Sequence, residues 1–318
     1  MNIIRMSGGL ERQLFQYAFY LKLTSMGREV KFDDINEYQD DKTRPIMLSV
    51  FNIDYPRATW DEINRYTDGS TTIKARLRKL ILGRKVNVYK EQGFYDPHVF
   101  DNEDQYLDGK FMSQKYFEDI LPLVRQTYKF PPIEELNLTP QANADFLVYY
   151  DKITRSNSVG IHFRRSDSRY NEELYENICT DEYYKSAISY IEERIEAPKY
   201  FVFSNEPRWV KNWLKNIIKS LITPDMDNDA IKALRDRFVL VEANDEYTAY
   251  LDMFLLSQCK HNIISNSSFG WWGAWMNENP EKITIAPNVW LNGVDSTDIF
   301  TEGMILINSK GRVEKKVK

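Results

Sequence analysis

The chain has 318 residues, of which 42% are hydrophobic and 28% charged, as expected for a soluble globular protein with two domains or one large α/β domain. Its net charge of −5 argues against a general affinity for nucleic acid, although it leaves room for a local basic pocket that binds a phosphorylated ligand. Aromatic residues make up 14% of the chain, and their flat apolar faces suit both a core and the C–H side of sugar rings.

Several features bear on the cellular compartment. Cys179 and Cys259 lie far apart with no metal or redox spacing, so we expect free thiols in a reducing compartment. The first residues lack the apolar stretch of a signal peptide, and no run approaches the roughly 18 apolar residues that span a bilayer. A cytoplasmic protein is expected. For the basic tail at 310–318 we favour a solvated, disordered segment over peripheral contact with the inner membrane face.

The N-terminal part begins as an α/β layer. Residues 2–6 are predicted as a strand that ends at Ser7-Gly8-Gly9, and apolar residues then recur with a helical period from residue 10 to 21. Residues 30–32 are predicted as the next strand. Residues 74–85 interleave six basic residues with apolar ones. This pattern fits a helix on a membrane surface or a surface helix with a solvated basic face, and we favour the second.

A domain boundary is expected between residues 130 and 155, where two proline-containing segments precede a helical stretch. We assign residues 1–150 to an N-terminal α/β domain and residues 151–318 to a Rossmann-like domain. In the second, predicted strands alternate with helices: strands at 158–163, 199–204, 238–241, 262–265 and 283–286, and helices at 181–195, 207–219, 248–259 and 269–277. The alternation predicts a parallel sheet with helices on both faces.

Polar clusters follow three of these strands, where ligands bind in open parallel sheets. They are His162-Phe163-Arg164-Arg165-Ser166-Asp167, Ser204-Asn205-Glu206 and Ser265-Asn266-Ser267-Ser268. Arginine matches phosphate oxygens with a fork of donors, and the serines precede a helix whose N-terminus attracts anions. The clusters predict a diphosphate pocket that needs no metal; an Arg–Asp pair that holds a turn is the alternative.

The other motifs give weaker indications of a binding or catalytic site. Gly8-Gly9 has neither the dinucleotide-binding nor the P-loop spacing. Residues 225–229 alternate acids, but Ala230 stands where a calcium loop needs glycine, so these acids are expected to cap a helix. The three histidines have no ligand spacing, and no metal is expected. Trp271 and Trp275 share one helix face and are expected to pack in the core, with a ligand contact as the alternative.

Five ordered segments match known motifs: GGLERQLFQYA at 8–18, GKFMSQKYF at 109–117, HFRRSDS at 162–168, FSNE at 203–206 and CKHNIISNSSFGWWGAW at 259–275. On these motifs the chain resembles the α-1,2-fucosyltransferases of glycosyltransferase family 11 along nearly its whole length. The resemblance implies a GT-B-like fold of two Rossmann-like domains. It also implies that GDP-β-L-fucose binds mainly to the C-terminal half without a metal, while the acceptor enters between the domains.

The resemblance further implies the site residues and the reaction. Donor contacts are expected from Gly8, Gly9, Gln13, His162, Arg164, Arg165, Ser204, Asn205, Asn266, Ser267 and Ser268. L-Fucose would pass with inversion to a hydroxyl of a galactose-terminated glycan, with Arg164 and Arg165 stabilising the charge on the leaving phosphate. Asp167 is expected to orient the arginines, and Asp167 and Glu11 are both candidates for the base.

The chain also departs from the family pattern. Glu11-Arg12 replaces Gly-Asn in the opening loop, Ser166 replaces glycine and Ser168 replaces tyrosine. Two other interpretations therefore stay open: a fucosyltransferase with another acceptor or linkage, and a non-catalytic protein that binds a sugar or a nucleotide.

Overall fold

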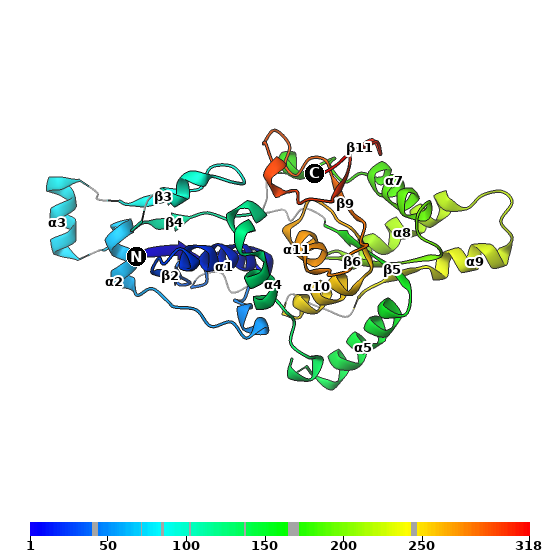
Figure 1. The fold of residues 1–318 in the computed structure, drawn as a ribbon, viewed down its shortest axis with the longest axis horizontal. Coiled ribbons are helices and arrows are strands. Elements are labelled where there is room, and N and C mark those ends of the chain that lie inside the picture. The colour runs from blue at the N-terminus through cyan, green and yellow to red at the C-terminus, as the bar shows by residue number, and fades with distance from the viewer. Residues whose placement is uncertain are drawn as a thin grey trace. The chain divides into compact units, whose positions relative to one another are not determined.

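The chain divides into two compact units, which are described separately (Figure 1). The computed structural model describes residues 1–39, 44–70, 72–83, 86–101, 103–136, 138–164, 172–242 and 247–318. The first unit is Met1–Pro131 and the second is Pro132–Lys318. The division falls at the proline pair rather than at residue 150, because α5 (Pro140–Thr154) packs against β5 and α10 of the second unit.

The first unit contains a four-stranded sheet in the order β2-β1-β4-β3, in which every pairing is parallel. Its strands are β1 (Asn2–Arg5), β2 (Val30–Asp33), β3 (Val88–Lys90) and β4 (Tyr106–Asp108). Its helices are α1 (Leu10–Ser25), α2 (Trp60–Thr67), α3 (Ile73–Leu82) and α4 (Leu121–Thr127). The predicted opening of strand, glycine turn, helix and strand is confirmed. Strands β3 and β4 were not predicted, because they have three residues each and therefore show little periodicity.

The second unit contains a seven-stranded sheet in the order β11-β10-β9-β8-β5-β6-β7. Its strands are β5 (Asn157–Phe163), β6 (Pro198–Ser204), β7 (Phe238–Leu240), β8 (His261–Ile263), β9 (Thr284–Pro287), β10 (Ile305–Ile307) and β11 (Val313–Lys316). Its helices besides α5 are α6 (Glu172–Tyr175), α7 (Asp181–Glu192), α8 (Pro207–Leu221), α9 (Asn228–Asp236), α10 (Ala249–Gln258) and α11 (Ser268–Met276). The predicted alternation of strands and helices is confirmed, and so is the α/β, GT-B-like class, since the first unit is built on a parallel sheet and the second on a mainly parallel one, each with helices.

One expectation about the C-terminal end is wrong, and two strands there were not predicted. Beyond β9, β10 adds to the sheet in parallel and β11 then pairs antiparallel with β10. The tail is therefore not disordered throughout, since residues 313–316 form β11. This strand has the sequence VEKK and is exposed along its length. A charged edge strand of this kind discourages pairing with other chains, but its composition hides it from a search for apolar alternation.

Helix starts follow from local capping chemistry. Thr59 and Glu62 form a capping box at the start of α2, and the Thr180 side chain accepts from the backbone N–H of Tyr183 at the start of α7. The side chain of Asp227 accepts from the backbone N–H of Ala230 at 2.7 Å. The expectation that the acids at residues 225–229 cap a helix is thus confirmed for Asp227.

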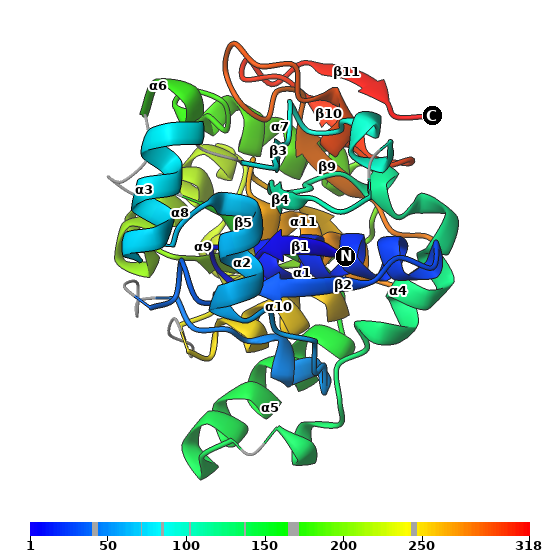
Figure 2. The same ribbon diagram turned by 90° about the vertical axis from the view of Figure 1, so that its left-hand side faces the viewer.

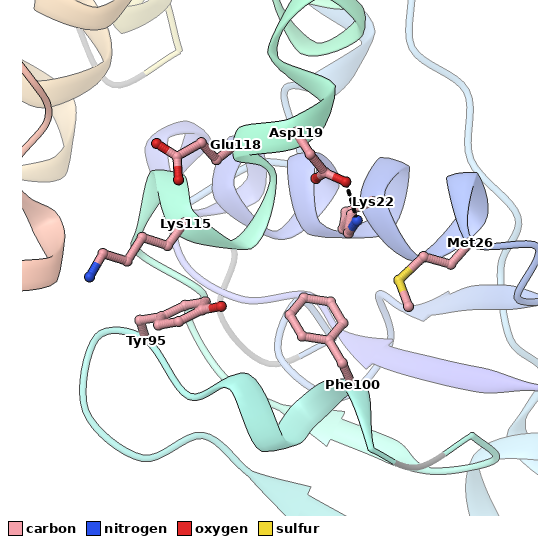
Figure 3. Close-up of a pocket in the computed structure, with 7 residues that line it drawn as sticks. All are labelled: Lys22, Met26, Tyr95, Phe100, Lys115, Glu118 and Asp119. Atoms are coloured by element: carbon pink, nitrogen blue, oxygen red, sulfur yellow. Dashed lines mark hydrogen bonds and ion pairs between the residues drawn. The ribbon is translucent and has the colours of Figure 1, made fainter.

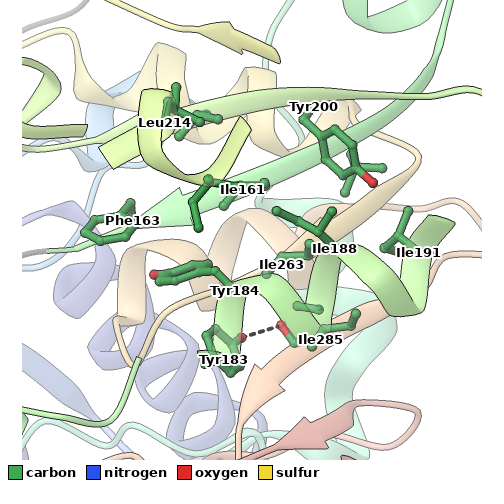
Figure 4. Close-up of a cluster of buried hydrophobic side chains, with 14 of the residues drawn as sticks. Ile161, Phe163, Tyr183, Tyr184, Ile188, Ile191, Tyr200, Leu214, Ile263 and Ile285 are labelled. Carbon is green, nitrogen blue, oxygen red and sulfur yellow. Dashed lines mark hydrogen bonds between the residues drawn. The ribbon is translucent and has the colours of Figure 1, made fainter. Parts of the chain in front are cut away.

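A buried apolar cluster joins β5, β6, β8 and β9 of the second unit to α7 and α8 (Figure 4). Ile161, Ile263 and Ile285 come from three of the strands, and each is fully buried together with Ile188 of α7. The Tyr183 hydroxyl donates to the Ile264 carbonyl at 2.6 Å, so this polar atom is satisfied inside the cluster. The cluster makes the sheet a rigid support for the loops at the carboxyl ends of its strands.

Candidate functional site

The second sheet has a topological switch point between β5 and β8. From β5 the chain adds β6 and β7 on one side of the sheet, and then returns to add β8, β9 and β10 on the other side. Ligands of open α/β sheets bind at the carboxyl ends of the two strands that flank such a point. In this chain those ends carry two of the predicted polar clusters, Arg164 after β5 and Ser265–Ser268 after β8.

His162 connects these two strand ends. Its ring is 4% exposed, its Nδ1 lies 3.0 Å from Ser265 Oγ, and it stacks on the Phe269 ring at 5.4 Å. Burial, together with the positive charge of Arg164, lowers the pKa of His162 to about 3. The imidazole is therefore neutral at physiological pH and positions the loop after β8.

Gly270 allows the first turn of α11 to lie directly on this ring. A Cβ atom at position 270 would lie 2.7 Å from His162 Nδ1 and 2.9 Å from its Cγ. Any larger residue would therefore displace the helix or the imidazole. The missing side chain of Gly270 thus sets the N-terminus of α11 against the end of β5.

The N-terminus of α11 offers backbone donors. Ser267 is the N-cap and Ser268 the first helical residue, and the Ser267 side chain makes no capping hydrogen bond. The first N–H groups of a helix have no partner within the helix, and the helix dipole adds positive potential there. Ser267 and Ser268 are both partly exposed, so the predicted anion site is accessible at this helix end.

Asn266 has a different role from its neighbours. Its Nδ2 donates to the Trp290 carbonyl at 3.1 Å, and its Oδ1 lies 3.5 Å from Cys179 Sγ. These contacts use both ends of the amide within the protein, so Asn266 holds the loop in place. These contacts give Asn266 a positioning role, and the expected donor contact stays a prediction.

Of the paired arginines, the structure describes Arg164, which directly follows β5 and is partly exposed. Arg165, Ser166 and Asp167 lie outside the described residues. On the neighbouring strand end, Ser204 Oγ accepts from the backbone N–H of Glu206 at 3.0 Å, and Asn205 is exposed. Because β6 pairs with β5 in parallel, residues 204 and 205 lie at the same edge of the sheet as Arg164.

The glycine loop of the first unit is held by two buried glutamines. Gln13 contacts the carbonyls of Gly8 and Pro45 through Nε2, each at 3.0 Å, and accepts from the Met47 N–H at 2.9 Å. This amide is fully buried and bonded within its own unit, so Gln13 fixes the glycine loop. Its expected contact with the donor stays a prediction. Gly8 has a φ of +73°, which favours glycine at this position.

Gln16 is the second of these glutamines, and the sequence analysis did not single it out. Its Nε2 donates to the carbonyls of Arg5 and Gly109, each at 2.8 Å, and its Oε1 accepts from the Ser7 N–H at 3.0 Å. It thereby joins the 8–18 motif to the 109–117 motif across β1 and β4. A polar residue between Phe15 and Tyr17 on the buried face of α1 was the available signal.

The two unusual residues of the loop fold back over its glycines. A Cβ at Gly9 would lie 2.7 Å from Glu11 Oε2, and a Cβ at Gly8 would lie 2.9 Å from Arg12 Nε. Arg12 Nη1 also donates to Ser7 Oγ at 3.4 Å. The Glu11 carboxylate is therefore at the carboxyl end of β1, next to the backbone of the Gly8-Gly9 turn.

A surface pocket of about 410 Å³ lies beside α1 in the first unit (Figure 3). Tyr95 and Phe100 form its aromatic side, and the Lys22–Asp119 ion pair, at 2.5 Å, borders it from the opposite side. Lys115, which belongs to the 109–117 motif, has its Nζ 5.7 Å from the centre of the Tyr95 ring. The lining thus combines apolar ring faces with both donors and acceptors, which suits a polyhydroxylated ligand.

The tryptophans of α11 belong to the core. Trp271 and Trp275 are 0% and 4% exposed, and Trp271 Nε1 donates to the Ile299 carbonyl at 2.7 Å. The expected core packing is confirmed. Among the described residues, no three His, Cys, Asp or Glu side chains are grouped so that they could hold a metal ion.

The burial of His162 predicts a pH dependence of stability. Between pH 6.5 and about 3, histidine in the unfolded chain binds a proton that the native His162 does not bind. The free energy of unfolding should therefore fall with decreasing pH in this window, by up to about 1.4 kcal/mol per pH unit from this group.

Histidine NMR should show His162 neutral until the protein unfolds. Exposed His98, whose pKa is raised by its hydrogen bond to Asp101, is the internal control. A His162 titration near pH 6.5 in the folded protein would contradict the assigned burial.

Comparison with known proteins gives the chain its family. The model of glycosyl transferase family 11 matches residues 148–307. The chain is 28% identical over 319 residues to the O-antigen biosynthesis glycosyltransferase WbnK of Escherichia coli, covering 94% of this chain and 98% of that protein. It is also 28% identical over 304 residues to an alpha-1,2-colitosyltransferase of Escherichia coli, covering 91% of each. A mutant of Arabidopsis thaliana FUT1 in complex with GDP matches with a TM-score of 0.47 and 14% identity, over 90% of this chain and 70% of that one. Since the family model covers half of the sequence, the chain belongs to glycosyl transferase family 11.

Proposed function

We propose that this glycosyltransferase moves L-fucose from GDP-β-L-fucose to a hydroxyl of a terminal galactoside, in α-1,2 linkage, with inversion and without a metal. The observation that carries the proposal is that Arg164 and the N-terminus of α11 follow the two strands, β5 and β8, that flank the switch point of the second sheet. A guanidinium and a helix N-terminus together form a site for a diphosphate. The motifs of the α-1,2-fucosyltransferases support fucose as the sugar and the 2-hydroxyl as its acceptor.

The donor is proposed to bind to the second unit. Arg164, together with Arg165, would contact the phosphate oxygens, and the backbone N–H of Ser268 and the hydroxyl of Ser267 would add donors. The hydroxyl of Ser204 and the amide of Asn205, at the end of β6, are proposed to contact the nucleotide. His162 and Asn266 act through the protein, since they hold the strand end and the loop that carry these groups.

The proposed reaction is a single displacement at the anomeric carbon. The acceptor oxygen forms a bond to this carbon while the bond to the β-phosphate oxygen breaks, so that the β-linked donor gives an α-linked product and GDP. Negative charge grows on the phosphate as it leaves, and fixed donors stabilise this charge most strongly in the transition state. The acceptor proton passes to a carboxylate, for which Glu11 and Asp167 are the candidates. Glu11 lies at the carboxyl end of β1, whereas the proximity of Asp167 to the arginines in the sequence supports a role in orienting the guanidinium groups.

The pocket beside α1 is proposed to hold part of the acceptor glycan. Ring faces such as those of Tyr95 and Phe100 pack on the C–H side of a pyranose, while Lys22, Glu118 and Asp119 have the polar atoms that bind hydroxyls. The charges that line the pocket balance, which suits a neutral hexose unit. This assignment places acceptor binding on the first unit and donor binding on the second.

The function is tested by an acceptor array with labelled GDP-fucose, in parallel with and without a chelator. We expect transfer to galactose-terminated acceptors, an α-1,2 linkage in the product, and equal rates in the presence of EDTA. GDP-colitose is a useful second donor, because one relative is an alpha-1,2-colitosyltransferase and colitose is 3-deoxy-L-fucose. Another linkage would support a fucosyltransferase of different specificity, whereas binding of GDP without transfer to any acceptor would support a non-catalytic protein.

Replacement of Arg164 tests the donor site. Arg164→Ala should lower kcat/KM by about 100-fold or more, as is typical when a donor to a developing negative charge is removed. Arg164→Lys should lower kcat/KM by a smaller factor, since lysine keeps the positive charge but lacks the fork of donors. The control is Arg155→Ala, because Arg155 lies in the same unit, is 79% exposed and pairs with Asp151. Wild-type turnover by Arg164→Ala, with unchanged circular dichroism, would refute the assignment.

Replacement of Tyr95 tests the acceptor pocket. Tyr95→Leu should raise the KM for the acceptor by about threefold to tenfold, because an aromatic contact with the sugar is lost. The KM for the donor should not change, since this residue lies in the other unit from the proposed donor site. Trp60→Leu is the matched control, as Trp60 is an exposed aromatic residue of the same unit. An equal rise in the KM for the acceptor in both variants would argue against the pocket.

A further inference from the structure

Helix α3 exposes its apolar face. Ile73, Leu77, Leu80 and Ile81 are 77%, 55%, 84% and 76% exposed. Their spacing of i, i+4, i+7 and i+8 aligns them on one side of the helix. In a helix that packs on its own protein, such a stripe faces the core. In α3 it faces outward, and the helix lies next to α2 at the periphery of the first unit (Figure 2).

Two basic side chains on the opposite side of α3, Arg78 and Lys79, hold the helix to the protein. The guanidinium of Arg78 donates to Asp68, which is buried, and Lys79 Nζ donates to the Ser70 carbonyl at 2.8 Å. Lys79 Nζ also lies 3.8 Å from Asp68 Oδ1. The favoured expectation of a surface helix with a solvated basic face is therefore wrong for this pair, because their charges bind the chain itself and the apolar stripe is what meets the solvent.

The charges that remain exposed border the stripe. Lys74 and Arg76 are exposed, and the helical angles place them on opposite edges of the apolar face. The helix has four basic residues and no acidic one, in a chain of net charge −5, and Arg84 and Lys85 follow in the sequence. Apolar side chains bordered by cations on both edges match an anionic lipid surface, where the phosphates lie above the acyl chains.

We propose that α3 attaches the protein to the surface of an anionic bilayer. The stripe of Ile73, Leu77, Leu80 and Ile81 enters the boundary between headgroups and acyl chains, while Lys74 and Arg76 contact lipid phosphates. With ten residues, α3 is too short to span a bilayer, so the proposed contact is with the surface. Gly83, with a φ of +74°, ends the helix and limits the contact to about three turns.

The proposal is tested by co-sedimentation of the full chain with vesicles of equal parts phosphatidylglycerol and phosphatidylcholine, and with vesicles of phosphatidylcholine alone. The wild type should bind the first and much less of the second, with an affinity that falls as salt is added. Leu77→Ser with Leu80→Ser should weaken binding by about tenfold or more, because two buried apolar contacts with lipid are lost. Lys74→Gln with Arg76→Gln should weaken it by about fivefold for each charge removed.

Matched controls remove the same groups elsewhere. Leu147→Ser with Val148→Ser takes two exposed apolar side chains from α5, and Lys211→Gln with Lys215→Gln takes two exposed charges from α8. Both controls should bind phosphatidylglycerol vesicles like the wild type, and all variants should keep the wild-type melting temperature because the replaced side chains are exposed.

Equal binding to both vesicle types, or equal losses in the controls, would overturn the proposal. Self-association without lipid that is abolished by the Leu77 and Leu80 changes would instead assign the stripe to a second copy of the chain. None of these readouts depends on the donor or acceptor, so the proposal can fail independently of the proposed function.

Discussion

The buried imidazole of His162 holds together the two strand ends that form the candidate donor site. It closes the end of β5, hydrogen bonds to Ser265 at the end of β8, and supports the first turn of α11 through the space that Gly270 leaves open. A neutral ring is suited to this place because a charged one would be costly to bury next to Arg164. Arg164 and the helix N-terminus therefore keep a fixed relation, because His162 and Gly270 supply the packing between the two strand ends and leave Arg164 partly exposed. This separation of support from chemistry is typical of sites that must be in place before the ligand arrives.

The first unit uses a similar device with amides in place of an imidazole. Gln13 and Gln16 are fully buried on α1, and their hydrogen bonds go to the backbone of the glycine loop and of the segment after β4. Buried amides need partners, so the loop can relax only by leaving them unsatisfied, which is costly. The glycine turn is thereby held open at the carboxyl end of β1, with Glu11 and Arg12 lying over it. The two family motifs of this unit are one structural element, although about 90 residues separate them in the sequence.

Helix α3 shows how the same pattern can have opposite outcomes. The residues at 74–85 have the periodicity of an amphipathic helix, and the favoured expectation from the sequence was a surface helix with a solvated basic face. The buried carboxylate of Asp68 instead attracts Arg78 and Lys79, which turns the basic side inward. An acid at the end of α2, outside the helix itself, thus decides which face meets the solvent. Periodicity identifies two faces but does not say which one the protein covers.

The sequence by itself determined the α/β class, the alternation of strands and helices in the second unit, and the polar clusters at the strand ends, because these depend on local periodicity and on residue type. It also indicated that the acids at residues 225–229 cap a helix, as Asp227 does, since capping is a contact between residues three apart. Only the tertiary structure decided which polar residues are supports: Gln13, Gln16, His162 and Asn266 have partners that are distant in the sequence. The tertiary structure also decided the pairing of β11 with β10, because a charged strand acquires its conformation from the neighbouring strand. Long-range contacts of this kind produce no periodic pattern in the sequence. The tertiary structure is therefore needed to distinguish the residues that can contact a ligand from the residues that hold them in place.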